Sequence, residues 1–269
     1  MTDTIVLLHG GATGSSSWNP VARSLVSSGA SVFAPDMLGY GASPAPTGSY
    51  AIAEEVAHLT RLLGLQPHFY NGTLYAVGFG GTFHLVTHSL GSLIGLHLRR
   101  ALGARVTRMT LVDPVVVSVL RECGEDDAYA EMEEQYQRFT SLSADHEAAA
   151  HYFVDHWGGA GAWDSMGSRG RTTVRSLVPT LRLEMTATRS DTATLGWLAE
   201  SPPPTTILVG ERTLLAPRAV ARLLAPALAA TTVTVSGAGH MIPITHPAAV
   251  VDAVRRDGVA RSRSEGARA

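Results

Sequence analysis

Short apolar runs alternate with helical segments along most of this sequence, and that alternation limits the possible folds more than any other feature. The runs are rich in β-branched residues and end at glycine, serine, aspartate or histidine. Continuous apolarity is typical of strands buried on both faces, as in parallel sheets. The pattern therefore predicts a doubly wound, mainly parallel α/β sheet. Its strands are expected at residues 4–8, 30–36, 83–88, 106–112, 206–209 and 231–235.

The alternation stops between residues 114 and 201, where helical segments follow one another. An all-helical insertion inside an α/β pattern is typical of a lid over a site. We expect helices over about residues 121–139, 143–157 and 174–184. The predicted domains are a core of residues 1–113 and 202–256, a helical lid of residues 114–201, and a disordered polar tail of residues 257–269.

The segment before residue 83 predicts one further element, a β-hairpin. Residues 68–70 and 73–77 have the character of two short strands, and Asn71-Gly72 between them is a typical tight turn. The sequence indicates no function for this hairpin.

The composition argues against several functional classes. A net charge of −2 gives no electrostatic case for binding nucleic acid or an anionic membrane. All 21 basic residues are arginine, which excludes a Schiff-base lysine, a pyridoxal-phosphate enzyme and a lysine-based phosphate loop. Cys123 is the single cysteine and fits a reducing compartment. With no visible secretory signal and no apolar run near the roughly 20 residues that span a bilayer, we expect a cytoplasmic protein.

Residues that can perform nucleophilic and acid–base chemistry follow three of the predicted strands. In open parallel sheets, ligands bind beyond the carboxyl ends of the strands. Ser89 lies between a strand and an apolar helix, Asp113 follows the next strand, and His240 lies in a glycine-rich turn after the last one. A serine hydroxyl becomes a nucleophile when a histidine accepts its proton and a carboxylate orients that histidine. The pattern predicts Ser89 as the nucleophile and His240 as the general base.

With these residues in place, the chain resembles the α/β-hydrolase superfamily over about residues 4–256. The resemblance implies a cofactor-free enzyme whose oxyanion hole consists of two backbone N–H groups, from Leu90 and from Gly11, with Ala12 as a substitute for Gly11. The matching segments are Leu8-His9-Gly10-Gly11, Asp36 with the glycine-rich turn after it, His88-Ser89-Leu90-Gly91, and Gly237-Ala238-Gly239-His240.

Two positions depart from the superfamily pattern. Thr87 stands where the nucleophile turn has glycine, and we interpret it as a tolerated small residue. Thr213 stands where many members have an aspartate, so the acid must come from elsewhere. We predict Asp113 as that acid. It follows the strand at residues 106–112, which is the sixth along the chain when the two hairpin strands are counted. Glu211 is the alternative, and Asp113-Pro114 could also simply begin a turn.

Aromatic residues in the predicted lid are candidates for a substrate pocket. The segment from Phe153 to Trp163 resembles a lid segment in a group of uncharacterised bacterial α/β-hydrolases. Trp157 and Trp163 could line an apolar pocket or equally fasten the lid to the core. His88 is expected to be a packing residue, and His9 to shape the oxyanion loop. No histidines have the spacing of a metal site, so no metal is expected.

The sequence as a whole favours a serine hydrolase that cleaves a small ester, lactone or thioester through an acyl-enzyme. Acyl transfer or cleavage of a carbon–carbon bond by the same triad is one alternative. The other is a binding protein of the same fold with an incomplete triad, a hypothesis motivated by Thr87 and Thr213.

Overall fold

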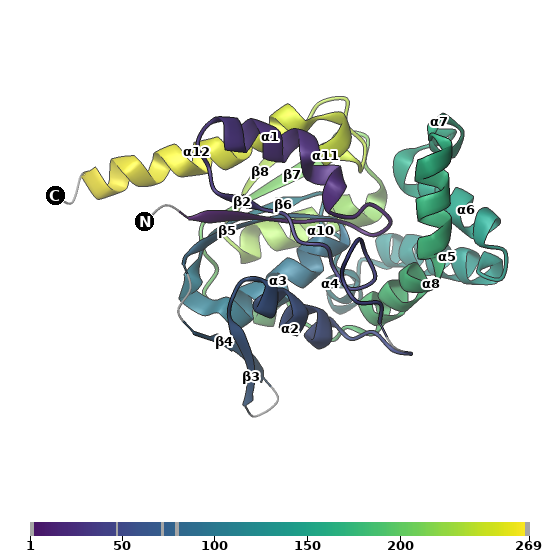
Figure 1. Ribbon diagram of the computed structural model, residues 1–269, viewed down its shortest axis with the longest axis horizontal. Helices are drawn as coiled ribbons and strands as arrows, with labels where there is room; N and C mark the ends of the chain where they lie inside the picture. The colour runs from purple at the N-terminus through teal and green to yellow at the C-terminus, as the bar shows by residue number, and fades with distance from the viewer. Residues whose placement is uncertain (1–2, 47, 71–72, 79–80, 267–269) are drawn as a thin grey trace.

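A six-stranded parallel sheet forms the centre of the protein (Figure 1). The computed structural model describes residues 3–46, 48–70, 73–78 and 81–266. The strand order is β2-β1-β5-β6-β7-β8, and every neighbouring pair is parallel. The strands are β1 (Thr4–Leu8), β2 (Val32–Phe33), β5 (Phe83–His88), β6 (Val106–Val112), β7 (Thr205–Gly210) and β8 (Thr231–Val235). The predicted parallel α/β sheet is therefore confirmed.

Helices cover both faces of the sheet because successive strand residues point to opposite faces. On one face, Leu7 and Val86 pack with residues of α1 (Asn19–Ser27) and α12 (Pro247–Gly266). On the other face, residues such as Leu85 form a larger core with the remaining helices of the sheet domain. These helices are α2 (Ile52–Leu62), α3 (Leu90–Leu102) and α10 (Leu215–Ala227). β5 and β7 are buried along their whole length, which accounts for the apolar residues on both of their faces.

A helical insertion lies between β6 and β7, as predicted (Figure 1). Its helices α5 to α8 form a group beside the sheet. Phe139 and Phe153 from this group belong to the same core as Leu85 of β5, so the insertion packs directly on the sheet domain. The helices are α4 (Val117–Glu122), α5 (Asp126–Leu142), α6 (His146–Gly158), α7 (Ala162–Ser165), α8 (Ser168–Ser190) and α9 (Leu195–Leu198).

Three further segments of the described chain are a β-hairpin, the short helix α11 (Ile242–Thr245) and the last helix. The predicted hairpin is present as the antiparallel pair β3 (Gln66–Tyr70) and β4 (Thr73–Val77). Its expected turn, Asn71-Gly72, lies outside the described residues. The last helix, α12, continues to Gly266, beyond residue 256, where the predicted core ends and the predicted disordered tail begins. No helix in the described part of the chain is both long and apolar enough to cross a membrane.

Candidate active site

Ser89 occupies a sharp turn between β5 and α3. Its backbone has φ 54° and ψ −124°, which is unusual for a residue other than glycine. The Ser89 N–H donates to the carbonyl oxygen of Val112 at 3.1 Å, and the Ser89 carbonyl accepts from the N–H of Ser92 at 2.9 Å. These hydrogen bonds hold the strained turn in place, so the serine side chain projects from the carboxyl edge of the sheet.

Close packing around the turn accounts for its small residues, including the unexpected Thr87. A Cβ at Gly91 would lie 2.5 Å from the carbonyl oxygen of His9, so a larger residue does not fit. Thr87 is fully buried, and its methyl group lies 2.6 Å from where a Cβ would be at Gly95. Thr87 Oγ1 also donates to Ser92 Oγ at 3.0 Å. The glycine at 95 provides the room that the β-branched Thr87 needs.

His240 connects Ser89 to Asp113 through two hydrogen bonds. His240 Nε2 lies 2.9 Å from Ser89 Oγ, and His240 Nδ1 lies 2.6 Å from Asp113 Oδ2. Because a carboxylate can only accept, the imidazole N–H is assigned to Nδ1, which leaves Nε2 to accept the serine proton. All three side chains are buried. The structure thus brings together the serine, histidine and aspartate singled out in the sequence.

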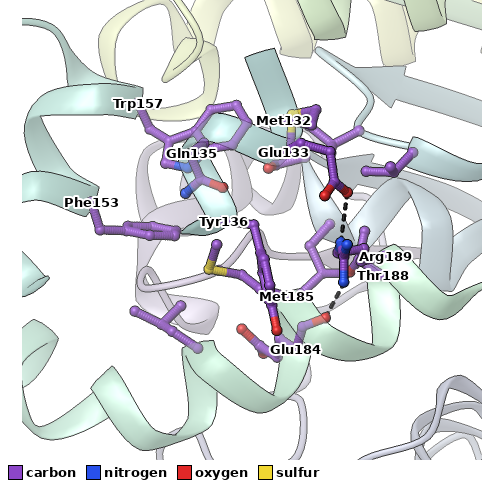
Figure 2. A pocket seen from close by; sticks show the side chains of 16 residues that line it. Met132, Glu133, Gln135, Tyr136, Phe153, Trp157, Glu184, Met185, Thr188 and Arg189 are labelled. Carbon is purple, nitrogen blue, oxygen red and sulfur yellow. Dashed lines mark hydrogen bonds and ion pairs between the residues drawn. The ribbon is translucent and has the colours of Figure 1, made fainter. Parts of the chain in front are cut away.

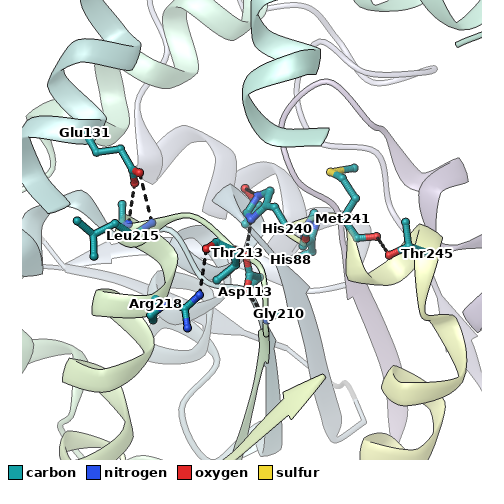
Figure 3. Close-up of polar contacts among 12 residues, drawn as sticks. His88, Asp113, Glu131, Gly210, Thr213, Leu215, Arg218, His240, Met241 and Thr245 are labelled. Carbon is teal, nitrogen blue, oxygen red and sulfur yellow. Dashed lines mark hydrogen bonds and ion pairs between the residues drawn. The ribbon is translucent and has the colours of Figure 1, made fainter. Parts of the chain in front are cut away.

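Asp113 accepts hydrogen bonds from three directions (Figure 3). Besides the His240 imidazole, the Gly210 N–H donates to its Oδ1 at 3.0 Å and the Thr213 hydroxyl donates to its Oδ2. Asp113 itself has a positive φ of 47° directly after β6. Thr213 occupies the position where many superfamily members have the acid, and here it hydrogen-bonds the acid that comes from the neighbouring strand. Sequence reasoning noted Thr213 only as a missing carboxylate.

Glu211, the alternative acid, lies in a different environment. It is exposed, and its Oε2 accepts hydrogen bonds from the Gly237 N–H at 2.7 Å and the Ser236 hydroxyl at 3.1 Å. These bonds lower the pKa of Glu211, the Gly237 N–H having the larger effect. Glu211 therefore connects the loop after β7 to the end of β8 by hydrogen bonds, whereas Asp113 faces His240.

His88 supports the backbone at His240. Its Nε2 lies 2.9 Å from the His240 carbonyl oxygen, and the two imidazole rings are 4.9 Å apart. Burial, together with the neighbouring His240, lowers the pKa of His88 to about 3. A neutral His88 with its proton on Nε2 donates to that carbonyl. The expected packing residue thus also forms a specific hydrogen bond.

The loop after β1 lies next to the serine and is held by polar contacts. His9 is fully buried, which lowers its pKa to about 4. The Met37 N–H donates to His9 Nε2 at 3.1 Å, so His9 Nδ1–H donates to the Gly10 carbonyl at 2.8 Å. The Ala12 N–H donates to the Tyr40 hydroxyl at 3.0 Å. Since Ala12 is engaged, Gly11 is the better candidate from this loop for an oxyanion hole.

A pocket opens at Ser89 and extends under the helical insertion (Figure 2). The core contributes Ser89 with the two candidate oxyanion residues, Gly11 and Leu90. The insertion contributes most of the remaining wall, which is largely apolar. From α5, α6 and α8 the lining residues are Met132, Glu133, Gln135, Tyr136, Phe153, Trp157, Leu181, Glu184, Met185, Thr188 and Arg189.

The two tryptophans proposed for the pocket have different surroundings. Trp157 lines the pocket, and its ring lies 4.4 Å from the His240 ring. Trp163 is buried outside the pocket, where its ring stacks on His151 at 5.7 Å. The backbone N–H of Trp163 donates to Asp155 Oδ1 at 2.8 Å. Trp157 thus belongs to the site, whereas Trp163 joins α7 to α6.

Sequence reasoning missed two buried polar residues of the pocket, Gln135 and Glu184. A signal for both was present in the helical periodicity. Glu184 continues the buried stripe of Leu177 and Leu181 on α8, and Gln135 lies between Met132 and Phe139 on α5. A polar residue at an apolar position of such a stripe indicates a buried polar interaction. In the described part of the chain, no cluster of three or more histidine, cysteine or acidic side chains could hold a metal ion.

Comparisons with known proteins agree with this architecture. A structure from the thaumarchaeon Nitrososphaera gargenis, from work on its carboxylesterases, has a TM-score of 0.70 at 15% identity and covers 98% of this chain and 92% of its own. The enol-lactonase of Burkholderia xenovorans LB400 has a TM-score of 0.70 at 20% identity, with coverages of 95% and 91%. At these identities the likeness shows the fold alone.

Sequence comparisons give a curated relative and a family. Probable lysophospholipase BODYGUARD 3 of Arabidopsis thaliana is 30% identical over 116 residues, which are 42% of this chain and 21% of that protein. The chain therefore matches about a fifth of the length of this relative. The model of the "Alpha/beta hydrolase family" matches residues 5–253. On this match across nearly the whole sequence, the chain belongs to the α/β-hydrolase family.

Proposed function

We propose that this protein is a cofactor-independent serine hydrolase that cleaves a small carboxylic ester, lactone or thioester through an acyl-enzyme. The observation that supports it most is the continuous hydrogen-bond chain from Ser89 Oγ through His240 to Asp113. Similarity to structures described as carboxylesterases and an enol-lactonase supports ester-like substrates. The family alone does not determine the reaction, because one fold hosts many functions.

In the first half-reaction, Ser89 Oγ attacks the substrate carbonyl carbon while His240 Nε2 accepts the serine proton. The carbonyl oxygen becomes an oxyanion, which the N–H groups of Gly11 and Leu90 stabilise by hydrogen bonds. His240 then gives its proton to the leaving alkoxide, and the acyl group remains on Ser89. Throughout, Asp113 accepts from Nδ1–H and stabilises the imidazolium.

In the second half-reaction, water takes the place of the alcohol. His240 removes a proton from water as the oxygen attacks the acyl-enzyme, and returns that proton to Ser89 Oγ when the acid leaves. We also propose that the helical insertion, residues 114–201, acts as a lid on a core of residues 1–113 and 202–256. Its side chains exclude bulk water from the reacting groups and shape the pocket.

Hydrolysis of activated short-chain esters by the wild type and by Ser89→Ala tests the proposal. We expect the variant to lose about 10⁶-fold in kcat. Ser118→Ala is a matched control, because Ser118 is buried on α4 and hydrogen-bonds Asp191 outside the pocket. Adding an acceptor alcohol to the same assay separates hydrolysis from acyl transfer by the products formed. Full activity of Ser89→Ala would contradict the proposal.

A further inference from the structure

Three buried polar atoms of the pocket wall have no hydrogen-bond partner among the described residues. They are Gln135 Nε2, Glu184 Oε1 and Trp157 Nε1. The side chains of Gln135 and Glu184 are almost completely buried, at 1% and 2% exposure. In Figure 2, Gln135 and Trp157 lie on one side of the pocket and Glu184 on the opposite side. Buried polar groups in folded proteins nearly always have partners. Because these three side chains line one pocket, a molecule bound there is the candidate partner.

Glu184 is held so that one carboxyl oxygen faces protein and the other is unpaired. The Tyr40 hydroxyl, which accepts from the Ala12 N–H, donates to Glu184 Oε2 at 2.9 Å. Burial raises the pKa of Glu184 well above its ordinary value, although the hydrogen bond from Tyr40 acts in the opposite direction. The neutral form of Glu184 is therefore favoured. Because Oε2 accepts from Tyr40, we assign the proton of that form to Oε1.

The three unpaired atoms are thus all hydrogen-bond donors: one O–H and two N–H groups. A substrate that satisfies them must bring acceptor oxygens. The basic group of the pocket wall, Arg189, is already paired with Glu133 at 2.6 Å and lies over the Tyr136 ring at 4.8 Å. A buried anion would therefore lack a free cation, which favours an uncharged acceptor.

The donors adjoin the reacting groups. A Cβ at Gly11 would lie 3.4 Å from Glu184 Oε2, which places Glu184 beside the candidate oxyanion loop. The Trp157 ring lies 4.4 Å from the His240 ring. An acceptor that reaches these donors therefore lies close to the scissile carbonyl, and we assign it to the acyl group.

We propose that the pocket selects acyl groups with a second, uncharged carbonyl oxygen near the scissile one, bound by Gln135, Glu184 and Trp157. The substrate class is then an oxo-substituted ester or lactone, which rests on the proposed function. A plain acyl chain would bury these donors without partners, and sites of this kind reject such analogues strongly.

Selectivity between ethyl 3-oxobutanoate and ethyl butanoate tests this inference. The measured quantity is the ratio of kcat/KM for the two esters, compared between variants so that their intrinsic reactivities cancel. Gln135→Met keeps the length of the side chain and removes the amide. We expect it to lower the ratio about tenfold. Gln137→Met is the matched control, because Gln137 is exposed on the same helix.

Two substitutions of Glu184 distinguish a neutral acid from a carboxylate. Glu184→Gln keeps an acceptor for Tyr40 and a donor toward the pocket, so we expect a ratio within about twofold of the wild type. Glu184→Leu removes both and should lower the ratio about tenfold. Retention of the oxo preference by both Gln135→Met and Glu184→Leu would overturn the inference. A tenfold loss in Glu184→Gln would also overturn it.

The possible outcomes distinguish a failure of this inference from a failure of the proposed function. If the wild type cleaves both esters and Ser89→Ala does not, an unchanged ratio in the variants refutes oxo selection alone. If the wild type cleaves neither ester, protection of Ser89 from a fluorophosphonate probe by each ester gives the same comparison, and equal protection refutes oxo selection. If the probe does not label Ser89, the proposed function fails and the inference fails with it. Thermal unfolding of each variant verifies that it is folded.

Discussion

The carboxyl edge of the sheet and the helical insertion meet at one pocket. They differ in whether their buried polar groups have hydrogen-bond partners. At the sheet edge, Asp113 accepts three hydrogen bonds and the His240 carbonyl accepts from His88. In the insertion, Gln135 Nε2 and Glu184 Oε1 are buried without a hydrogen-bond partner among the described residues. A satisfied network fixes reacting groups in one geometry, whereas buried groups without a protein partner remain able to bind a ligand. The comparison assigns the proposed chemistry to the sheet and the proposed selectivity to the insertion.

The largest expected effect concerns the acid at the sheet edge. Asp113→Asn removes the charge that stabilises the His240 imidazolium and favours the wrong tautomer, so kcat should fall about 10⁴-fold. Glu211→Gln is the control, because Glu211 binds Ser236 and Gly237 at the surface. Steady-state kinetics on an activated ester gives both values. Equal losses in the two variants would contradict the assignment of Asp113.

A smaller effect is expected at Thr213, the residue that hydrogen-bonds the acid. Thr213→Val keeps the shape of the side chain and removes its hydroxyl, so Asp113 accepts one hydrogen bond fewer. Hydrogen bonds to charged groups contribute about 1.5–3 kcal/mol, so kcat should fall at least tenfold. Thr213→Ser restores the hydroxyl and should recover most of the activity. If Thr213→Ser is as slow as Thr213→Val, the hydroxyl is not the cause, and Thr213 acts only by packing.

The smallest effect concerns a buried acid outside both regions, Glu55 of α2, which accepts from the Leu38 N–H and the Tyr50 hydroxyl. Burial raises the pKa of Glu55 from 4.5 to about 7. Its neutral form is therefore favoured in the folded state. The corresponding stability is fully present below about pH 4.5 and is lost as the pH rises through about 7. The shift corresponds to about 3 kcal/mol.

Thermal unfolding of the wild type and Glu55→Gln between pH 5 and pH 8 measures this effect. Glutamine does not titrate, so the advantage of the wild type in Tm should shrink by several degrees as the pH rises. Glu54→Gln, at the exposed neighbouring position, should show no such trend. A constant difference in Tm between wild type and Glu55→Gln would show that Glu55 ionises normally.

The sheet edge was more predictable from sequence than the insertion. The candidate triad could be proposed because strand periodicity placed Ser89, Asp113 and His240 at the ends of parallel strands, which must meet at one edge. The sequence also indicated where the helical insertion begins, but not its details. The helix expected over residues 121–139 is divided into α4 and α5 near Gly124, whose φ of 71° suits glycine.

The pocket of the insertion depends on contacts between distant helices. Local periodicity shows that Gln135 and Glu184 face inward, but not that they face the same space. That follows only from the packing of α5 against α8 and from the Tyr40 contact across the boundary. Thr213 is a similar case, because its partner Asp113 lies on another strand.

The central claim is that Ser89 is a nucleophile activated by His240 and oriented by the sheet edge. Reaction with a fluorophosphonate probe, followed by mass spectrometry of the peptides, tests it most directly. We expect a single adduct on Ser89 in the wild type, and labelling slower by orders of magnitude in His240→Ala and Asp113→Asn. An adduct on another residue, or labelling of Ser89 at the same rate in all three proteins, would contradict the account.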